Sequence, residues 1–388
     1  MDKGTSICAD NTVFCDLFCR AIEIDGSILY NETIKKQRED KKMIAVIKTV
    51  ISVFMAVTCF FTSGFFGKYA GKISPVDKDN VRLSFATISD SHLTDSKLRA
   101  AMLELGFYDM EHAETPLDAL VFVGDNTDHG YVEQYELLKE TAAKYTPAKQ
   151  MLMAVGNHDT WTEDENGEDS PALTKEYFLK YVNEITGRDI SELYYTAEIN
   201  GYTFIMLGSE STHTDAYISP AQLQWLDAEM AKAAGKGKPV FVVSHWPING
   251  SHGLPGTWGD KDPEPDDGGF GDQSDDIENI LKKYDDVFLI SGHIHSGFTA
   301  PGQKNVYGYL SVESDGNFHS VNLPSYMYMS TRGRISNGTG YVIEVYDDEV
   351  LIRARSYSTG VWYTLYDYEI PLSTAEGNPG RLDGGKIC

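Results

Sequence analysis

The sequence predicts an α/β fold, and two observations carry that prediction. From about residue 81 to residue 300, short apolar runs of strand-forming residues alternate with stretches of helical periodicity, whereas strands dominate beyond residue 300. Strands that alternate with helices are typical of a layered α/β architecture. The chain has 388 residues, of which 41% are hydrophobic, so it can build one large domain or two ordinary ones.

Charge and cysteine content exclude several classes of protein. The formal net charge is −25, from 58 acidic and 33 basic residues, so the surface repels nucleic-acid backbones and no nucleic-acid polymer is expected as a partner. The five cysteines are Cys8, Cys15, Cys19, Cys59 and Cys388. Because residues 60–387 contain none, a disulfide framework and a thiolate metal site are excluded from the main body. A zinc site made by the first three cysteines is disfavoured, because they precede the part predicted to fold.

The N-terminal region is predicted to hold one hydrophobic helix. Residues 1–42 show no periodicity and end in a charged run, so this segment is either cytoplasmic or untranslated. Residues 43–66 follow with Lys48 as their only charge, and they are long enough to span a bilayer. The basic residues that precede this span keep that side in the cytoplasm under the positive-inside rule. The rest of the chain is therefore expected to be exported.

An exported protein could be either anchored in the membrane or secreted. Residues 43–66 can be an uncleaved transmembrane anchor or the apolar core of a signal peptide. The 42 residues ahead of them favour an anchor, unless the true start lies at or near Met43. The protein is thus predicted to be membrane-anchored with an extracytoplasmic catalytic domain, or secreted. Cys59 is a poor lipidation site, because Thr58 stands where a small residue is needed.

Five buried strands and three helices are predicted between residues 81 and 300. The strands are 82–89, 118–125, 150–157, 239–245 and 286–293. The helices are 95–105, 131–145 and 219–234. The last helix begins with Ser219 before Pro220, which is a preferred N-cap followed by proline at the first helical position.

The C-terminal part is predicted to consist of strands of the same domain. Residues 340–358 form a hairpin, and the aromatic stretch 359–372 is predicted to be an edge strand that packs on the sheet. Residues 260–276 are acidic and rich in glycine and proline, so they are predicted to form a long surface loop rather than a domain linker. The predicted domain spans residues 77–371, and a tail of residues 372–388 follows it.

Polar side chains that can bind metals follow every one of the five predicted strands. In open α/β sheets, ligands bind beyond the carboxyl ends of the strands. The residues that follow the five strands are, in order, Asp90 and His92; Asp125 and Asp128; Asn157, His158 and Asp159; His245; and His293 and His295. One such pair is typical of a cap and a packed histidine, but five in succession indicate a shared site.

These side chains have the chemistry of a site for two metal ions. Residues two apart on a strand point to the same side, so Asp90 with His92, and His293 with His295, are expected to converge. Oxygen and imidazole ligands without thiolate suit manganese, iron or zinc. Seven of the residues named above can act as ligands. They are too many for one metal site, but they fill two metal sites that share a water. Two ions about 3.5–4 Å apart lower the pKa of that water and clamp a phosphoryl group.

The order and spacing of these motifs resemble those of the calcineurin-like metallophosphoesterases. The matching blocks are Asp90-x-His92, Gly124-Asp125-x-x-Asp128, Gly156-Asn157-His158-Asp159, His245 and Gly292-His293-x-His295. The resemblance implies a four-layer metallophosphatase sandwich, in which two mixed β-sheets pack face to face with helices outside. It also implies that the strands after residue 300 complete the second sheet rather than form a separate domain.

The resemblance implies a role for each of these residues. Seven would bind metal: Asp90, His92 and His295 one ion, Asn157, His245 and His293 the other, and Asp125 both. His158 would instead act near the leaving-group oxygen as general acid or electrostatic stabiliser, and Asp128 or Asp159 would position it. The implied reaction is hydrolysis of a small phosphodiester or phosphomonoester by attack of a metal-bridging hydroxide. The cofactors would be two divalent ions of manganese, iron or zinc.

Departures from related enzymes narrow the subgroup. Purple acid phosphatases have a metal-binding tyrosine where this chain has Asp128, and the Ser/Thr protein phosphatases have a phosphate-gripping arginine where it has His129. Whether His129 contacts substrate is left open. The Gly-Asn-His-Asp block and the short Asp-x-His block look more like the cyclic-nucleotide and glycerophosphodiester phosphodiesterase branch. A diester is therefore expected over a monoester.

Substrate choice is expected to reside in loops at the mouth of the site, above all in residues 245–276. Four side chains there would contact a leaving group or pack the loop on itself: Trp246, Asn249, His252 and Trp258. In a second loop, residues 208–219, Glu210 and His213 are predicted to be structural.

Two functions from different classes stay open. The first is an exported, dinuclear metal-dependent phosphoesterase. The alternative is a non-catalytic, metal-containing cell-surface module that keeps the scaffold for binding. Pseudoenzymes usually lose a bridging carboxylate, a ligand histidine or the general acid, whereas Asp125, His158 and all seven presumed ligands are present. An enzyme is therefore expected. A metallo-β-lactamase-like hydrolase is excluded, because no His-x-His-x-Asp-His run occurs.

Overall fold

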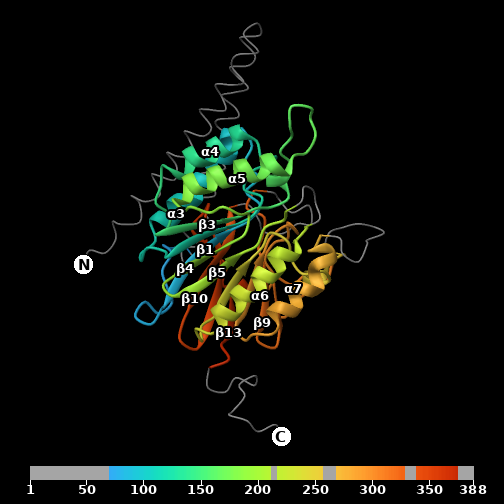
Figure 1. Ribbon diagram of the computed structural model, residues 1–388. Helices are drawn as coiled ribbons and strands as arrows, with labels where there is room; N and C mark the ends of the chain where they lie inside the picture. The colour runs from blue at the N-terminus through green and yellow to red at the C-terminus, as the bar shows by residue number, and fades with distance from the viewer. Residues whose placement is uncertain (1–69, 211–215, 257–267, 328–337, 375–388) are drawn as a thin grey trace, which may run out of the picture.

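Two mixed β-sheets form the centre of the protein (Figure 1). The computed structural model describes residues 70–210, 216–256, 268–327 and 338–374. The strands of the first sheet are β1 (Leu83–Ile88), β2 (Ala119–Val123), β3 (Gln150–Ala154), β10 (Thr339–Val345), β11 (Glu349–Ser356), β12 (Val361–Trp362) and β13 (Tyr368–Pro371). Their order is β12–β11–β10–β1–β2–β3, and β13 also pairs with β11. β1, β2 and β3 run parallel, whereas β10 is antiparallel to β1.

The second sheet is also mostly parallel in its centre. Its strands are β4 (Tyr195–Ile199), β5 (Tyr202–Met206), β6 (Val240–Val243), β7 (Val287–Ser291), β8 (Val312–Asp315) and β9 (Phe318–Asn322). Their order is β4–β5–β6–β7–β9–β8. β5, β6, β7 and β9 run parallel, and an antiparallel neighbour closes each edge.

Helices flank both sheets. The α-helices are α3 (Lys97–Glu111), α4 (Val132–Ala142), α5 (Pro171–Thr186), α6 (Pro220–Ala234) and α7 (Ser274–Leu281), and the 3₁₀ turns are η1 (His158–Thr160), η2 (Ser251–Gly253), η3 (Gly271–Gln273) and η4 (Thr364–Tyr366). The predicted cap is confirmed, because the backbone N–H of Gln222 donates to Ser219 Oγ at 3.2 Å. Helix α5 was not predicted, although it begins with the same Ser-Pro pair at Ser170 and Pro171.

Three apolar cores separate four layers. Between the sheets, Phe85 of β1 packs edge-on against Phe204 of β5 and Phe241 of β6, with ring centroids 5.1 and 5.0 Å apart. A second core fills the space between the first sheet and α3, α4 and α5, and a third lies between the second sheet and α6 and α7. Figure 1 shows the two groups of helices over separate sheets. The prediction of two mixed sheets with flanking helices is therefore confirmed.

The placement of the last strands corrects one prediction. Of the described strands after residue 300, β8 and β9 complete the second sheet, whereas β10, β11, β12 and β13 extend the first. The physical reason is burial: all seven residues of β10 are buried, so this strand fills an interior position beside β1. The stretch 359–372 is not one edge strand, because η4 divides it into β12 and β13, which both pair with β11.

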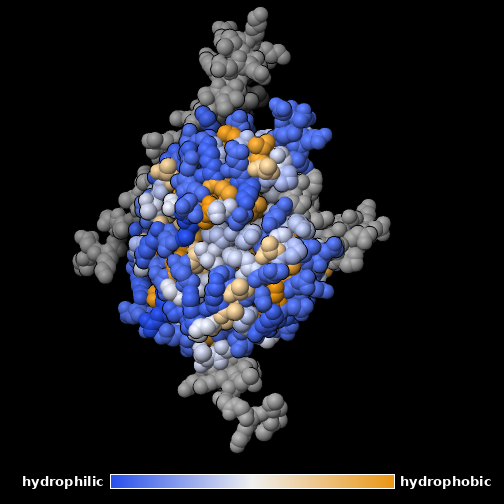
Figure 2. Space-filling model, in the orientation of Figure 1, coloured by the Kyte–Doolittle hydropathy of each residue, from blue (hydrophilic) through white to orange (hydrophobic). Residues whose placement is uncertain are grey.

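The surface shown in Figure 2 is dominated by hydrophilic residues, in line with the net charge of −25. Among the described helices, none has the length and apolar character needed to cross a membrane. The predicted hydrophobic helix of residues 43–66 and the segment before it lie outside the described residues.

Candidate metal centre

The loops that follow five parallel strands bring the predicted ligands together. These strands are β1, β2 and β3 of the first sheet and β6 and β7 of the second. Backbone hydrogen bonds continue beyond the strand ends. The N–H of Asp90 donates to the carbonyl of Gly124 at 3.1 Å, and that of His92 donates to the carbonyl of Asp125 at 2.9 Å. Neighbouring loops therefore hold their side chains next to one another.

Five of the predicted ligands have left-handed backbone conformations. The φ angles are 56° at Asp90, 39° at His92, 50° at Asp125, 69° at His293 and 52° at His295. This conformation is uncommon outside glycine and concentrates at functional sites. The spacing argument from strand geometry is therefore wrong, since β1 and β7 end before these residues. Their side chains converge because the loops turn, not because alternate residues of a strand share a face.

Four side chains form the first group of candidate ligands. One oxygen or nitrogen atom from each of Asp90, His92, Asp125 and His295 lies within 4.8 Å of the others. His295 Nε2 is 2.9 Å from Asp90 Oδ1 and 3.0 Å from His92 Nε2. His92 Nε2 is 3.5 Å from Asp125 Oδ2. Two imidazole lone pairs this close repel each other unless a proton or a cation lies between them.

A second group surrounds His245. Its Nε2 atom is 3.2 Å from Asp125 Oδ2, 3.2 Å from Asn157 Oδ1 and 3.2 Å from His293 Nδ1. Its other ring nitrogen, Nδ1, donates to the carbonyl of Val123 at 2.8 Å. This bond fixes the tautomer and leaves the Nε2 lone pair for a metal, as in other metal-binding histidines. Asp125 faces both groups.

The buried carboxylates indicate that this site suits cations. Oδ2 of Asp90 accepts no hydrogen bond from the described residues, and the side chain is fully buried. A buried anion without compensation is costly, by several kcal/mol. Gly292 allows the close packing, because a Cβ there would lie 1.8 Å from Ser89 Oγ and 2.7 Å from Asp90 Oδ2. The carboxylate, amide and imidazole donors fit borderline divalent ions.

The pKa shifts agree with this electrostatic picture. Burial alone would raise the pKa of Asp90, but the nearby His295 brings it down to about 2. Burial alone would lower the pKa of His245, but the Asp125 carboxylate raises it to about 9. Burial alone would also raise the pKa of Asp125, but the nearby His245, above all, holds that pKa well below its usual value. The carboxylates therefore stay ionised and attract positive charge.

His158 lies beside the metal ligands on the turn η1. Its backbone N–H donates to Asp125 Oδ1 at 2.9 Å, and its ring centroid is 4.4 Å from that of His92. Its Nδ1 atom is 2.9 Å from the main-chain carbonyl of Asp128. Because a carbonyl only accepts, Nδ1 carries the proton in this contact, and Nε2 is left for another partner. The contact with His158 thus comes from the main chain of Asp128.

Asp159 binds the loops rather than an imidazole ring. Its Oδ1 accepts from the backbone N–H and the hydroxyl of Thr127, at 2.9 and 2.8 Å. Its Oδ2 accepts from the backbone and side-chain N–H groups of Asn126 and from the N–H of Gly156, at 2.8 to 3.1 Å. These five bonds tie the loop after β2 to the loop after β3, so Asp159 fixes the geometry of both.

The carboxylate of Asp128 joins a contact that sequence reasoning missed. Its Oδ1 atom is 3.5 Å from His92 Nδ1 and 3.3 Å from Arg99 Nη1, and its Oδ2 is 3.3 Å from His129 Nδ1. Arg99 also donates to the carbonyl of His92. Carboxylates that contact a metal-binding imidazole orient it. The sequence signal that could have revealed this contact is Arg99, a basic residue near the start of the helix that follows the Asp90-x-His92 block.

Two of the predicted substrate residues pack the loop itself. Trp246 is fully buried, with its ring centroid 5.3 Å from that of His245, so it cannot stack on a bound leaving group. Asn249 Nδ2 donates to the carbonyl of Gly271 at 2.9 Å and braces the loop. Trp258 lies outside the described residues.

The loop of residues 208–219 bears out one structural prediction. The Glu210 carboxylate accepts from the N–H of Ser219 at 2.8 Å and from Gln222 Nε2 at 2.9 Å, at the start of α6. It therefore holds the loop against this helix. His213 lies outside the described residues.

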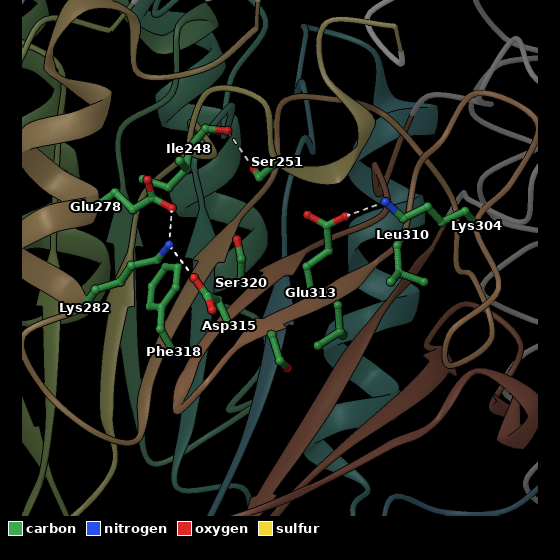
Figure 3. A pocket seen from close by; sticks show the side chains of 12 residues that line it. Ile248, Ser251, Glu278, Lys282, Lys304, Leu310, Glu313, Asp315, Phe318 and Ser320 are labelled. Carbon is green, nitrogen blue, oxygen red and sulfur yellow. Dashed lines mark hydrogen bonds and ion pairs between the residues drawn. The ribbon is translucent and has the colours of Figure 1, made fainter. Parts of the chain in front are cut away.

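His252 packs beside a separate pocket. Its Nδ1 is 2.6 Å from the carbonyl of Leu310, and its Nε2 is 2.9 Å from Ser320 Oγ. Ser320 lines a pocket of about 380 Å³ that includes none of the seven predicted ligands (Figure 3). The charges in this pocket pair with one another, as Lys282 does with Asp315 at 2.7 Å. His252 thus has a packing role in place of the substrate contact considered above.

The chain is similar to several known proteins. A probable cyclic nucleotide phosphodiesterase of Rhodococcus erythropolis is 28% identical over 230 residues, which cover 54% of this chain and 65% of the relative. A dimetal phosphatase from Danio rerio aligns with 14% identity and a TM-score of 0.49, over 76% of this chain and 100% of that one. A conserved uncharacterised protein of Streptococcus pneumoniae aligns with 12% identity and a TM-score of 0.33, over 74% and 97%.

The family model for calcineurin-like phosphoesterases matches residues 83–297, which is more than half of the chain and includes all seven predicted ligands. The chain belongs to the calcineurin-like phosphoesterase family.

Proposed function

We propose that the protein is a phosphoesterase that uses two divalent metal ions, of manganese, iron or zinc, to hydrolyse a small phosphodiester. The observation that carries this proposal is the convergence of two ligand groups on Asp125. One ion would be held by Asp90, His92 and His295, the other by Asn157, His245 and His293, and both by Asp125. When bound, such ions activate a shared water and neutralise charge on the phosphoryl group.

The protein's own groups would position the substrate and move a proton. His158 would direct Nε2 at the leaving-group oxygen, since its Nδ1 proton is engaged by the carbonyl of Asp128. The Asp128 carboxylate and Arg99 would keep His92 in its orientation. Asp159 would position these groups indirectly, because it holds the loop after β2 against the loop after β3.

A diester is the proposed substrate for two reasons. One relative, 28% identical over 230 residues, is a probable cyclic nucleotide phosphodiesterase. In addition, His129 stands where the monoester-cleaving protein phosphatases have arginine. A phosphomonoester dianion needs more positive charge for binding than a diester monoanion does. Without a guanidinium at this position, the phosphate site has less positive charge, so the site favours the diester.

The first test compares two model esters. The full chain, purified in mild detergent, is stripped of metal and then supplied with manganese. We expect metal-dependent turnover of bis-p-nitrophenyl phosphate that exceeds turnover of p-nitrophenyl phosphate. Asp125→Asn should abolish both activities, whereas the surface control Asp347→Asn, at an aspartate that pairs with Arg82, should keep them.

The same experiment separates the alternative function. A non-catalytic binding module would bind two ions per chain yet turn over neither ester with manganese, iron or zinc. That result would replace the enzyme by a binding scaffold. A higher rate on the monoester would keep the enzyme but reverse the proposed substrate preference.

We also propose that the domain acts outside the cytoplasm, with residues 43–66 as anchor or signal segment. The apolar run and the basic residues before it support this location. Fractionation of cells and N-terminal sequencing of the mature chain test the proposal. Recovery of the intact chain from the cytosol would contradict it.

A further inference from the structure

We propose that His129, Tyr131 and Trp161 form an aromatic subsite that stacks a planar ring of the substrate's leaving group, namely a nucleobase. This inference rests on the proposed phosphodiesterase function and assigns it a substrate class. None of the three rings holds a metal in that proposal. Two belong to the loop between β2 and α4, and the third ends the turn η1.

The three rings form a contiguous cluster beside His158. The centroid of Trp161 lies 3.9 Å from that of His158, and His129 lies 5.7 Å from Trp161 and 6.4 Å from His158. Tyr131 stacks on His129 at 5.4 Å, with 25° between the ring planes. A leaving group whose oxygen lies at His158 would therefore have aromatic rings beside it.

These aromatic rings are at least partly accessible to solvent. The side chain of His129 is 42% exposed, Tyr131 is 36% exposed and Trp161 is half-buried. The other tryptophan beside the metal centre, Trp246, is fully buried in the helix-side core, so it offers no face to a ligand. A contiguous set of accessible rings next to a catalytic histidine has the form of a stacking platform.

Hydrogen bonds and close backbone packing hold the two loops of the platform together. The backbone N–H of His129 donates to Gln134 Oε1 at 2.8 Å, and Thr162 Oγ1 donates to the carbonyl of Gly130 at 3.3 Å. Gly130 has φ +67°, and a Cβ there would lie 2.5 Å from the carbonyl oxygen of Asp159. The two loops therefore pack in direct contact. Pre-organised rings lose little entropy when they bind a base.

Charge near the platform selects among ligands. Partial burial raises the pKa of Tyr131, and the carboxylates of Glu163 and Asp169 add to that effect. These carboxylates would repel a second phosphate. They leave an uncharged base or a cationic head group as the candidates. His129 and Tyr131 stack with 25° between their planes, whereas Trp161 lies at 62° to His129. The near-parallel pair offers a flat face rather than a cage around a quaternary ammonium, and a nucleobase fits that face.

Binding of reaction products isolates the base contribution. The full chain loaded with manganese is titrated calorimetrically with AMP and with ribose 5-phosphate, which lacks the base. We expect AMP to bind about 10-fold more tightly, in the range of one stacked base. Tyr131→Ala and Trp161→Ala should bring the two affinities close together, whereas Trp161→Phe should retain most of the difference. Tyr307→Ala, at an exposed tyrosine outside the subsite, is the matched control.

Kinetics provide the second readout. Tyr131→Ala should raise KM for 3′,5′-cyclic AMP several-fold and leave KM for glycerophosphoethanolamine unchanged. Equal losses on both esters, or no preference for AMP in the wild type, would overturn the subsite. So would a loss confined to glycerophosphocholine, which would indicate a cation site. If the wild type hydrolyses no ester, the proposed function fails, and the ratio of AMP to ribose 5-phosphate affinities still decides the inference.

Discussion

Buried histidines occur in two regions of the molecule, and their partners differ. Beside the pocket on the second sheet, both ring nitrogens of His252 have neutral partners, a main-chain carbonyl and the hydroxyl of Ser320. His319 contacts Ser314 Oγ at 2.8 Å and packs on Phe288. The ring of His252 is satisfied as a single neutral tautomer, whereas Nε2 of His319 has no hydrogen-bond partner among the described residues. Both rings belong to the packed fold rather than to the candidate metal centre.

At the strand ends the histidine nitrogens face each other and carboxylates. His92 and His295 approach at 3.0 Å, and His245 and His293 at 3.2 Å, beside Asp90 and Asp125. Backbone conformation does not separate the two regions, because His252 also has a positive φ of 53°. The chemistry of the groups that contact the histidines separates the two regions. The difference shows that convergent lone pairs and buried carboxylates, rather than burial or strain, mark a cation site.

The largest expected effect comes from the shared carboxylate. Asp125→Asn removes a charge that faces both ligand groups, at 3.5 Å from His92 Nε2 and 3.2 Å from His245 Nε2. Changes outside the coordination sphere alone cost roughly 10–100-fold in metal affinity, so this change should cost about 100-fold or more, together with turnover. Metal content after gel filtration and the rate on bis-p-nitrophenyl phosphate measure it. Unchanged metal content would remove the proposed distinction between the two regions.

A substitution of His158 should lower the catalytic rate without changing the metal content of the protein. His158→Asn removes the group proposed to act on the leaving oxygen, so kcat should fall by roughly 10²–10⁴-fold while the metal content stays the same. His112→Asn, at an exposed histidine that ends α3, is the matched control. If metal content falls with kcat in His158→Asn, this residue belongs with the ligands instead.

Asp159 should affect stability more than catalysis. Asp159→Asn removes the charge that accepts five hydrogen bonds, so the free energy of unfolding should fall by about 3 kcal/mol. Urea unfolding of the metal-free protein measures this, with Asp227→Asn at an exposed ion pair as control, expected within about 0.5 kcal/mol. If Asp159→Asn unfolded with the same free energy as the wild type, Asp159 would not stabilise the two loops.

The smallest effect concerns a histidine of the structural region. Burial lowers the pKa of His319 to about 4 from its ordinary 6.5. The unfolded chain therefore binds this proton more readily, so stability is complete above about pH 6.5 and declines as pH falls toward 4. The cost should be about 2 kcal/mol at pH 5. In metal-free protein, His319→Gln should flatten this acid dependence relative to the wild type, whereas His112→Gln should not. An identical acid limb in His319→Gln would contradict the shift.

The fold was largely predictable because its central strands are continuous apolar runs. β1, β2, β3, β6 and β7 all fall within the predicted strands. Sheet membership was not predictable, since the hairpin of β10 and β11 carries no mark of which sheet it joins. Helix α5 was missed although its Ser-Pro start repeats that of α6. The N-terminal span stays a prediction.

The candidate site was predictable as a set but not as a geometry. Strand ends with Asp, Asn and His gave all seven presumed ligands, because residues in such loops lie together whatever the loop conformation. The roles around them depend on contacts between distant segments. Sequence could not choose between Asp128 and Asp159, nor reveal that Arg99 reaches Asp128. The ring of Trp161, four positions after Asn157, acquires meaning only next to His129.

Anomalous scattering from crystals of the manganese-loaded protein tests whether two ions share Asp125. We expect two peaks per chain, about 3.5–4 Å apart, one on either side of the Asp125 carboxylate. Asp125→Asn crystals should lose at least one peak. A single peak, or peaks away from Asp125, would rule out the proposed shared site.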